Sequence, residues 1–180
     1  MVKIRIRSTT ILGVRVGKKI ALGGDGQVTL GDMQLKSKAI KVREFNNGKV
    51  LAGFAGAAAD AMSLFEKFEL KLDETGGNLQ RAVVEMAKDW RMDKILRELD
   101  ALLAIMDNRY AFILSGTGDV IEPDNNIISI GSGSGYAISA ARAFLKTGEK
   151  DPEKIVKESL HITADLCIYT NDKITVLGGK

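Results

Sequence analysis

The stretch Ser8-Thr9-Thr10-Ile11 lies a few residues into the chain, at the start of an apolar segment. Hydroxyl and β-branched residues are typical of a strand, which we predict over residues 9–16. If the peptide bond before Thr9 is cut, this one residue carries both a nucleophilic hydroxyl and a basic α-amine. The reference pKa of an α-amine is roughly 7.7–8.0, so a useful fraction is unprotonated near neutral pH. Taken alone, the stretch favours a plain first strand. Evidence for a catalytic role of Thr9 has to come from the rest of the chain.

The composition is typical of a single globular domain: 180 residues, of which 45% are hydrophobic and 27% charged. The net charge of +3 is spread over both signs and does not favour a nucleic-acid partner. No apolar run is long enough to span a bilayer, so we expect no membrane association. The single cysteine excludes an internal disulfide and fits a cytoplasmic protein, and the single histidine gives little support to histidine-based catalysis or zinc sites. We expect residues 1–8 to be a short leader and residues 9–180 to form the domain.

Alternating and helical patterns predict the order strands, two helices, strands, two helices, strand. The predicted strands cover residues 9–16, 19–22, 40–45, 49–55, 101–106, 110–114, 120–121, 127–130 and 173–177, with short or irregular strand at 28–35. The predicted helices cover residues 56–72, 79–96, about 136–146 and 152–168. Each helix pair follows antiparallel hairpins, so the order differs from a βαβ alternation. The predicted fold is an α+β four-layer αββα sandwich, with two stacked antiparallel sheets covered by helices on the outside.

Apolar residues at helical spacing predict which side chains face the core, and core packing is the simplest explanation for these stripes. The first helix is expected to bury Ala58, Ala61, Met62, Phe65, Phe68 and Leu72. The second is expected to bury Leu79, Val83, Met86 and Trp90, and the fourth Ile155, Val156, Leu160, Ala164 and Ile168. Asn78 and Asp151 are the predicted N-caps of the second and fourth helices.

Several other residues have two interpretations. Asp25, in the turn Gly23-Gly24-Asp25-Gly26, is either a surface aspartate or a carboxylate aimed at a cation. The glycines at 131–135 are spaced G-x-G-x-G, which does not match a dinucleotide-binding fingerprint. Gly53 to Gly56 lacks the Gly-Lys-Ser/Thr of a phosphate loop, so no ATP site is predicted. His161 is interpreted as a surface or structural residue, and Cys167 as an inert core thiol.

Taken together, eight segments resemble the bacterial proteasome-like peptidases, a branch of the N-terminal-nucleophile hydrolases. They are residues 9–11, 24–28, 41–43, 50–56, 59–61, 87–91, 130–133 and 167–170. The resemblance runs from Thr9 almost to the C-terminus, and it implies the same αββα fold. It also implies removal of the leader before Thr9 and a threonine-type endopeptidase activity.

The resemblance implies a role for each of five residues. Thr9 would attack the scissile carbonyl, with its own amine as base, through a water molecule. Lys41, on a strand expected to run beside Thr9, would disfavour protonation of that amine. Asp25 would pair with Lys41 and orient it. The backbone N–H of Gly53 would donate to the oxyanion. Ser132 would form a hydrogen bond near the amine.

The resemblance also implies a cofactor and partners. A monovalent cation, Na⁺, would be bound by the backbone carbonyls of Ala164, Cys167 and Thr170. The family usually has glycine where Ala164 stands, and a backbone ligand tolerates this change if φ is negative. The subunits would form two stacked hexameric rings, and a ring-shaped AAA+ unfoldase ATPase would feed unfolded proteins into them.

Three alternatives stay open at this point. The eight-residue leader is longer than is common in the family, and Ser8 could become the terminus instead of Thr9, with similar chemistry. The chain could be a catalytically silent ring subunit that keeps its leader. It could also be a non-proteolytic amidase on the same fold.

Overall fold

A computed structural model describes residues 9–31, 33–56, 58–94 and 101–179 of the chain. The strands are β1 (Thr10–Val16), β2 (Lys19–Gly24), β3 (Val28–Leu30), β4 (Met33–Lys36), β5 (Val42–Phe45), β6 (Val50–Ala55), β7 (Leu102–Met106), β8 (Ala111–Ser115), β9 (Val120–Ile121), β10 (Ile127–Gly131) and β11 (Thr175–Gly178). The helices are α1 (Ala58–Glu74), α2 (Leu79–Met92), α3 (Ser134–Lys146) and α4 (Pro152–Leu166). No helix within these described ranges is long and apolar enough to cross a membrane.

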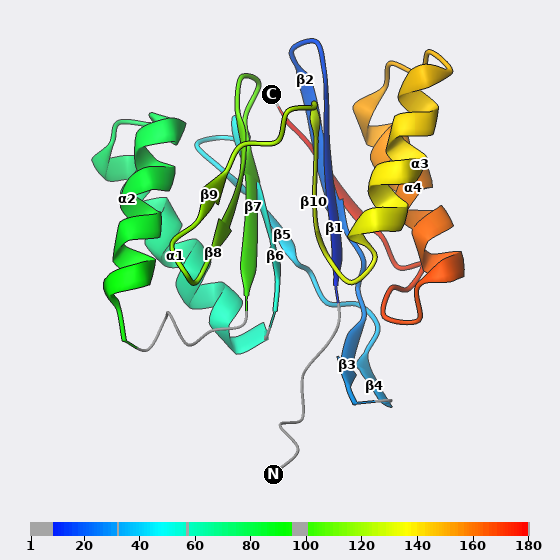
Figure 1. The fold of residues 1–180 in the computed structure, drawn as a ribbon, viewed down its shortest axis with the longest axis horizontal. Helices are drawn as coiled ribbons and strands as arrows, with labels where there is room; N and C mark the ends of the chain where they lie inside the picture. Colours follow the sequence, from blue (N-terminus) through cyan, green and yellow to red (C-terminus); the bar gives the residue numbers. More distant parts are fainter. Residues whose placement is uncertain (1–8, 32, 57, 95–100, 180) are drawn as a thin grey trace.

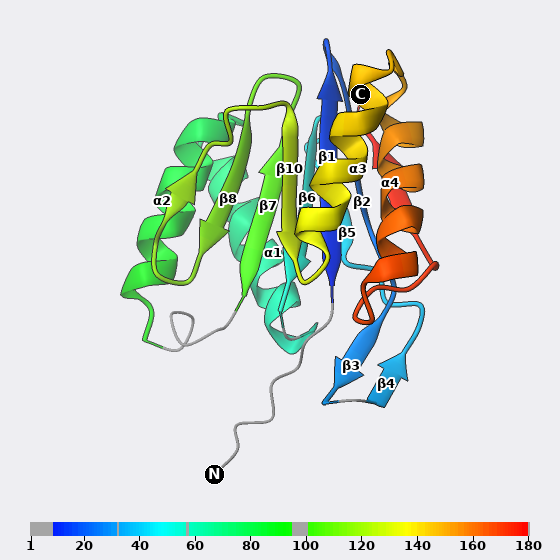
Figure 2. The same ribbon diagram turned by 45° about the vertical axis from the view of Figure 1, so that its right-hand side comes forward.

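The elements form four layers, as predicted (Figure 1). A five-stranded antiparallel sheet, β5-β6-β7-β8-β9, packs against a four-stranded antiparallel sheet, β10-β1-β2-β11. Helices α1 and α2 cover the outer face of the first sheet, and α3 and α4 cover the second (Figure 2). The β3–β4 hairpin projects from the end of the stack at which β1 begins. The fold therefore places the head of β1, next to Thr9, at the end of the stack where this hairpin projects.

Apolar side chains from both sheets fill the space between them. Ile11, Leu22, Leu51 and Met106 belong to this inner cluster and are almost completely buried. A Cβ atom on Gly53 would lie 2.7 Å from the Ile11 Cγ2 atom of the opposite sheet. The sheets can therefore approach closely at this point only because β6 carries glycine there.

The outer cluster under α1 and α2 provides a test of stability. Phe68 is fully buried, and its ring meets Phe45 edge-on at a centroid distance of 5.3 Å. We expect Phe68→Ala to lower the free energy of unfolding by about 3–5 kcal/mol, because a large cavity replaces the ring. Leu70→Ala is the matched control, since Leu70 lies on the same helix and is exposed. Urea denaturation measures both variants, and a loss below about 1 kcal/mol for Phe68→Ala would contradict this packing.

Three sequence predictions about helices are wrong. Met62 is 61% exposed, whereas Leu64 is fully buried. At 100° per residue, the buried stripe is centred between Leu64 and Phe65, and Met62 lies about 110° away from that centre. Helix α2 ends at Met92, with Asp93 as its C-cap, rather than at residue 96, which is outside the described residues. Ile168 lies beyond the end of α4 and is 77% exposed. The predicted N-caps Asn78 and Asp151 are confirmed by their side-chain hydrogen bonds.

Candidate active site

Thr9 is held at the head of β1 by its own carbonyl group. That carbonyl accepts a hydrogen bond from the backbone N–H of Ser132 at 3.0 Å. Gly131, at the end of the neighbouring strand β10, has φ of +95°, and a Cβ atom there would lie 2.0 Å from the Thr9 oxygen. Only glycine fits this position. The turn between β10 and α3 therefore fixes the backbone of Thr9, which is 1% exposed.

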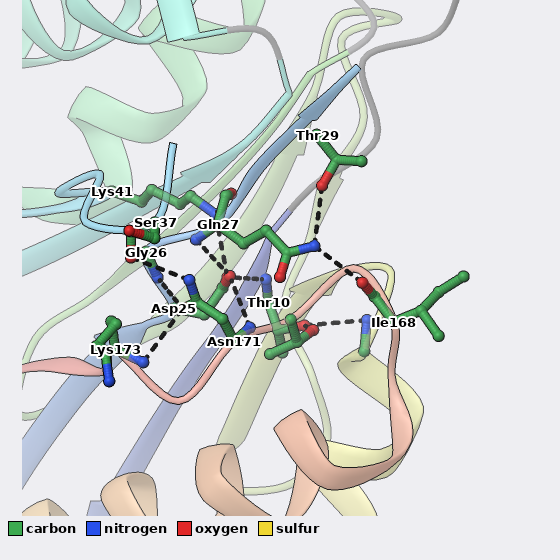
Figure 3. Close-up of polar contacts among 12 residues, drawn as sticks. Thr10, Asp25, Gly26, Gln27, Thr29, Ser37, Lys41, Ile168, Asn171 and Lys173 are labelled. Atoms are coloured by element: carbon green, nitrogen blue, oxygen red, sulfur yellow. Dashed lines mark hydrogen bonds and ion pairs between the residues drawn. The ribbon is translucent and has the colours of Figure 1, made fainter. Parts of the chain in front are cut away.

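Asp25 lies on the loop that follows β2, next to Thr10. Its carboxylate is fully buried and has four donors (Figure 3). Oδ1 accepts from the Thr10 N–H at 2.8 Å and from Lys41 Nζ at 3.1 Å. Oδ2 accepts from the Gln27 N–H at 2.8 Å and from the Asn171 N–H at 3.4 Å. Asp25 is therefore not a surface residue. The structure agrees with the other interpretation, in which its carboxylate faces a cation.

Lys41 is the cation that faces Asp25. Its ammonium group contacts Asp25 Oδ1 and the carbonyl oxygen of Gln27, and the residue is 3% exposed. Burial lowers the pKa of Lys41 below its ordinary value, and the neighbouring Asp25 carboxylate opposes that shift. One detail of the prediction is wrong: Lys41 does not lie on a strand beside Thr9. It lies one residue before β5, in the opposite sheet, where its carbonyl accepts from the Phe54 N–H.

Thr9 and Lys41 line the same cavity, which has a volume of about 150 Å³. Its other lining residues are Val28, Lys36, Ala39, Ile40, Phe54, Gly56, Met62 and Phe65. Most of these are apolar, so the cavity suits an apolar side chain of an extended peptide. The exposed position of Met62 is explained by this cavity, since its side chain lines it instead of the core.

Gly53 is not among the residues that line this cavity. Phe54, the next residue, donates its N–H to the carbonyl of Lys41, which directly precedes β5. Backbone N–H groups alternate in direction along a strand, so the Gly53 N–H points toward β7, where Gly53 pairs with Ala104. The prediction of Gly53 as an oxyanion donor therefore disagrees with the structure. Gly56, one residue past the end of β6, lines the cavity.

The prediction for Ser132 was a hydrogen bond near the amine of Thr9. In the structure, the Ser132 backbone N–H donates instead to the Thr9 carbonyl. Its side chain is exposed. Because α3 begins at Ser134, two residues later, the Ser132 N–H belongs to the turn that leads into the helix. The residue therefore reaches Thr9 in the structure by its main chain.

The predicted cation ligands lie at the C-terminal end of α4. Ala164 is in the last turn, Cys167 is the C-cap, and Thr170 closes a turn by donating its N–H to the Cys167 carbonyl at 3.0 Å. The last carbonyls of a helix lack intrahelical partners and carry partial negative charge. Carbonyl oxygens are suitable ligands for a hard cation such as Na⁺. The donor set therefore fits a monovalent cation, and among the described residues no cluster of His, Cys, Asp and Glu offers a different metal site.

Sequence reasoning missed Thr10, and it missed the side-chain contact of Thr170 that joins this loop to the head of β1. The Thr10 and Thr170 hydroxyl groups lie 2.7 Å apart, and both residues are buried. The Thr10 Oγ1 atom also accepts from the Gly133 N–H at 3.0 Å. The available signal was the second threonine of the Thr9-Thr10 pair, because a hydroxyl in a buried strand needs a partner.

The αββα sandwich, with a buried lysine–aspartate pair close to the head of its first strand, is consistent with the fold of the N-terminal-nucleophile hydrolases. Residues 6–177 match the family model described as "Proteasome subunit". The chain is 54% identical over 171 residues to "ATP-dependent protease subunit HslV" of Caldicellulosiruptor saccharolyticus, covering 94% of this chain and 97% of that protein.

Two solved structures extend the comparison. Eukaryotic HslV from Trypanosoma brucei matches with a TM-score of 0.87 and 43% identity, covering 94% of this chain and 98% of that one. The Thiobacillus denitrificans protein BPH, in complex with epoxomicin, matches with a TM-score of 0.71 over 95% of this chain and 98% of that one. At 16% identity, this second match shows the fold alone. The chain belongs to the proteasome-subunit family and, within it, to the HslV proteins, the proteasome-like subunits of an ATP-dependent protease.

Proposed function

We propose that this chain is a threonine-type endopeptidase with Thr9 as its nucleophile. The observation that carries the proposal is the single cavity that Thr9 and Lys41 share, with Asp25 paired to that lysine. The proposal requires removal of residues 1–8, because only then does Thr9 have a free α-amine. Ser8 as an alternative terminus is disfavoured, because the hydrogen bond from the Ser132 N–H fixes the backbone of Thr9, and Thr9 itself lines the cavity.

The reaction would proceed in two stages. The Thr9 hydroxyl oxygen forms a bond with the scissile carbonyl carbon, and its proton passes to the α-amine through a water molecule. The C–N bond then breaks, and the same proton passes to the leaving amine. Water next attacks the carbonyl carbon of the resulting ester, and the α-amine again accepts a proton. The ester C–O bond then breaks, the carboxylic acid product leaves, and the proton passes from the amine to the Thr9 oxygen, which regenerates the hydroxyl.

Two groups would stabilise these steps. The buried Lys41 ammonium disfavours protonation of the nearby α-amine and so keeps the base available. Asp25 orients this ammonium. The tetrahedral oxyanion needs a backbone N–H that faces the cavity. We assign that role to Gly56, because it lines the cavity, whereas the Gly53 N–H points toward β7.

The substrate class follows from the cavity and the family. An apolar cavity at the nucleophile suits extended, unfolded polypeptides, since a folded protein does not present its peptide bonds in this way. The family supports assembly into two stacked hexameric rings, served by a ring-shaped ATPase of the HslU (ClpY) type. Such an ATPase would unfold the substrates.

The carbonyls of Ala164, Cys167 and Thr170 would hold Na⁺ and so stabilise the loop after α4. Replacing Na⁺ by tetramethylammonium, at constant ionic strength, is expected to lower the thermal midpoint by a few degrees. It is also expected to lower the rate of hydrolysis several-fold, because Thr170 joins this loop to Thr10. Differential scanning calorimetry and a peptide assay measure the two effects. An unchanged midpoint and rate would contradict the site.

The function is tested by adding the ATPase, ATP and an unfolded protein substrate to the mature chain. We expect ATP-dependent degradation to short peptides, and intact mass should show a species that lacks residues 1–8. Full-length protein without any hydrolysis would identify a silent ring subunit. Hydrolysis of small amides alone, without stimulation by the ATPase, would identify an amidase.

A further inference from the structure

Asn171 lies in the loop between α4 and β11, and no step of the proposed mechanism uses it. Its side chain connects two segments of chain that are distant from it in sequence (Figure 3). The Oδ1 atom accepts from the Gly26 N–H at 3.1 Å, and the Nδ2 group donates to the Ser37 carbonyl at 2.9 Å. An amide side chain supplies an acceptor and a donor from one planar group. Asn171 therefore matches a site with an N–H on one side and a C=O on the other.

The two connected segments are the ones that carry the buried ion pair. Gly26 follows Asp25 directly, and the Asn171 backbone N–H also donates to the Asp25 carboxylate at 3.4 Å. Ser37 begins the irregular segment that leads to Lys41, between the end of β4 and the start of β5. These segments contact each other as well, since the Ala39 N–H donates to the Gly26 carbonyl at 2.9 Å. A loop without a strand ladder depends on such contacts for its position.

We propose that Asn171 is a positioning residue that sets the distance between Asp25 and Lys41 at the head of β1. This inference rests on the proposed function, since it concerns the ion pair that would serve Thr9. Asn171 does not line the cavity of Thr9, so it has no contact with substrate there. It acts through the carboxylate and the lysine.

The proposal has a consequence for pH dependence. Asp25 favours the charged form of Lys41 against the effect of burial, which lowers the Lys41 pKa. If the Asp25 loop moves away, this support weakens and the Lys41 pKa falls further. The ammonium is then lost at a lower pH, and the alkaline limb of the activity profile moves to lower pH. The Lys36 ammonium lines the same cavity as Lys41 and is a further charged group beside it. The new carboxylate of Asn171→Asp would add negative charge next to the Asp25 loop, which favours the charged form of Lys41 and would move that limb to higher pH.

The experiment compares Asn171→Ala and Asn171→Asp in the mature, assembled protein, with hydrolysis of a short fluorogenic peptide from pH 6 to pH 10. For Asn171→Ala we expect kcat to fall on the order of tenfold at neutral pH with an unchanged KM, and the alkaline limb to move to lower pH. For Asn171→Asp we expect the limb to move the other way. Asp172→Ala is the matched control, because Asp172 is the next residue and its ion pair with Lys173 is exposed. It should behave as wild type.

An unshifted alkaline limb in both variants would overturn the proposal, and so would a loss of activity that is equal at every pH. If Asn171→Ala does not fold, the shift in Asn171→Asp decides alone. Thr9→Ala, measured in parallel, separates this inference from the proposed function. An active Thr9→Ala protein would refute the function, whereas an inactive one beside unshifted Asn171 variants would refute only the role of Asn171.

Discussion

Thr9→Ala is expected to lower peptide hydrolysis on the order of 10⁴-fold, because the variant keeps the α-amine but has no hydroxyl to attack the substrate. The fold should be unaffected. The contacts that hold this residue are made by its backbone carbonyl, which alanine keeps. The thermal midpoint should therefore stay within a few degrees of wild type. A fluorogenic peptide assay and calorimetry on the same preparations measure both quantities.

Thr9→Ser is the matched control for this variant. It restores a hydroxyl at the same position, so activity within about tenfold of wild type is expected. Activity of Thr9→Ala close to wild type, in protein that has lost residues 1–8, would mean that another group is the nucleophile. Loss of activity in both variants with a large fall in the midpoint would mean that Thr9 is needed for folding instead.

Lys41→Met is expected to have the second largest effect, and it acts on stability as well as on activity. Removing the ammonium leaves the fully buried Asp25 carboxylate without its cation, which costs about 3–5 kcal/mol. We expect kcat to fall at least 10²-fold at neutral pH. Loss of the nearby positive charge raises the pKa of the α-amine, so the acid limb of the activity profile should move to higher pH.

The double variant Lys41→Met with Asp25→Asn separates the two effects. It removes both charges, so part of the lost stability should return while activity stays low. Urea denaturation and a pH–rate profile measure the outcome. An acid limb that is unchanged in Lys41→Met would contradict the proposed effect of this lysine on the amine.

The fold could be predicted closely because its elements have strong local signals. Two such signals lie where we expected them: the turn at Gly17-Lys18, and the N-cap Asp151 with Pro152 after it. Errors occur where local pattern and tertiary structure disagree. Met62 has the hydrophobicity of a core residue, but its direction depends on which residues of α1 meet the sheet.

The site could be predicted only in part, for a similar reason. The pairing of Asp25 with Lys41 followed from the resemblance, and the structure has that pair. Gly53 and Gly56 both lie in one matched segment, but the direction of a strand N–H cannot be inferred from sequence. Asn171 acts across 145 residues to Gly26, and a single asparagine in a loop gives no signal of such a contact.

The central claim is that one residue supplies both the nucleophile and its base, and amino-terminal sequencing of fully active protein tests it most directly. Our account predicts a single sequence that begins Thr9-Thr10-Ile11-Leu12. A terminus at Met1 or Ser8, or a blocked Thr9, in material with undiminished activity would contradict it.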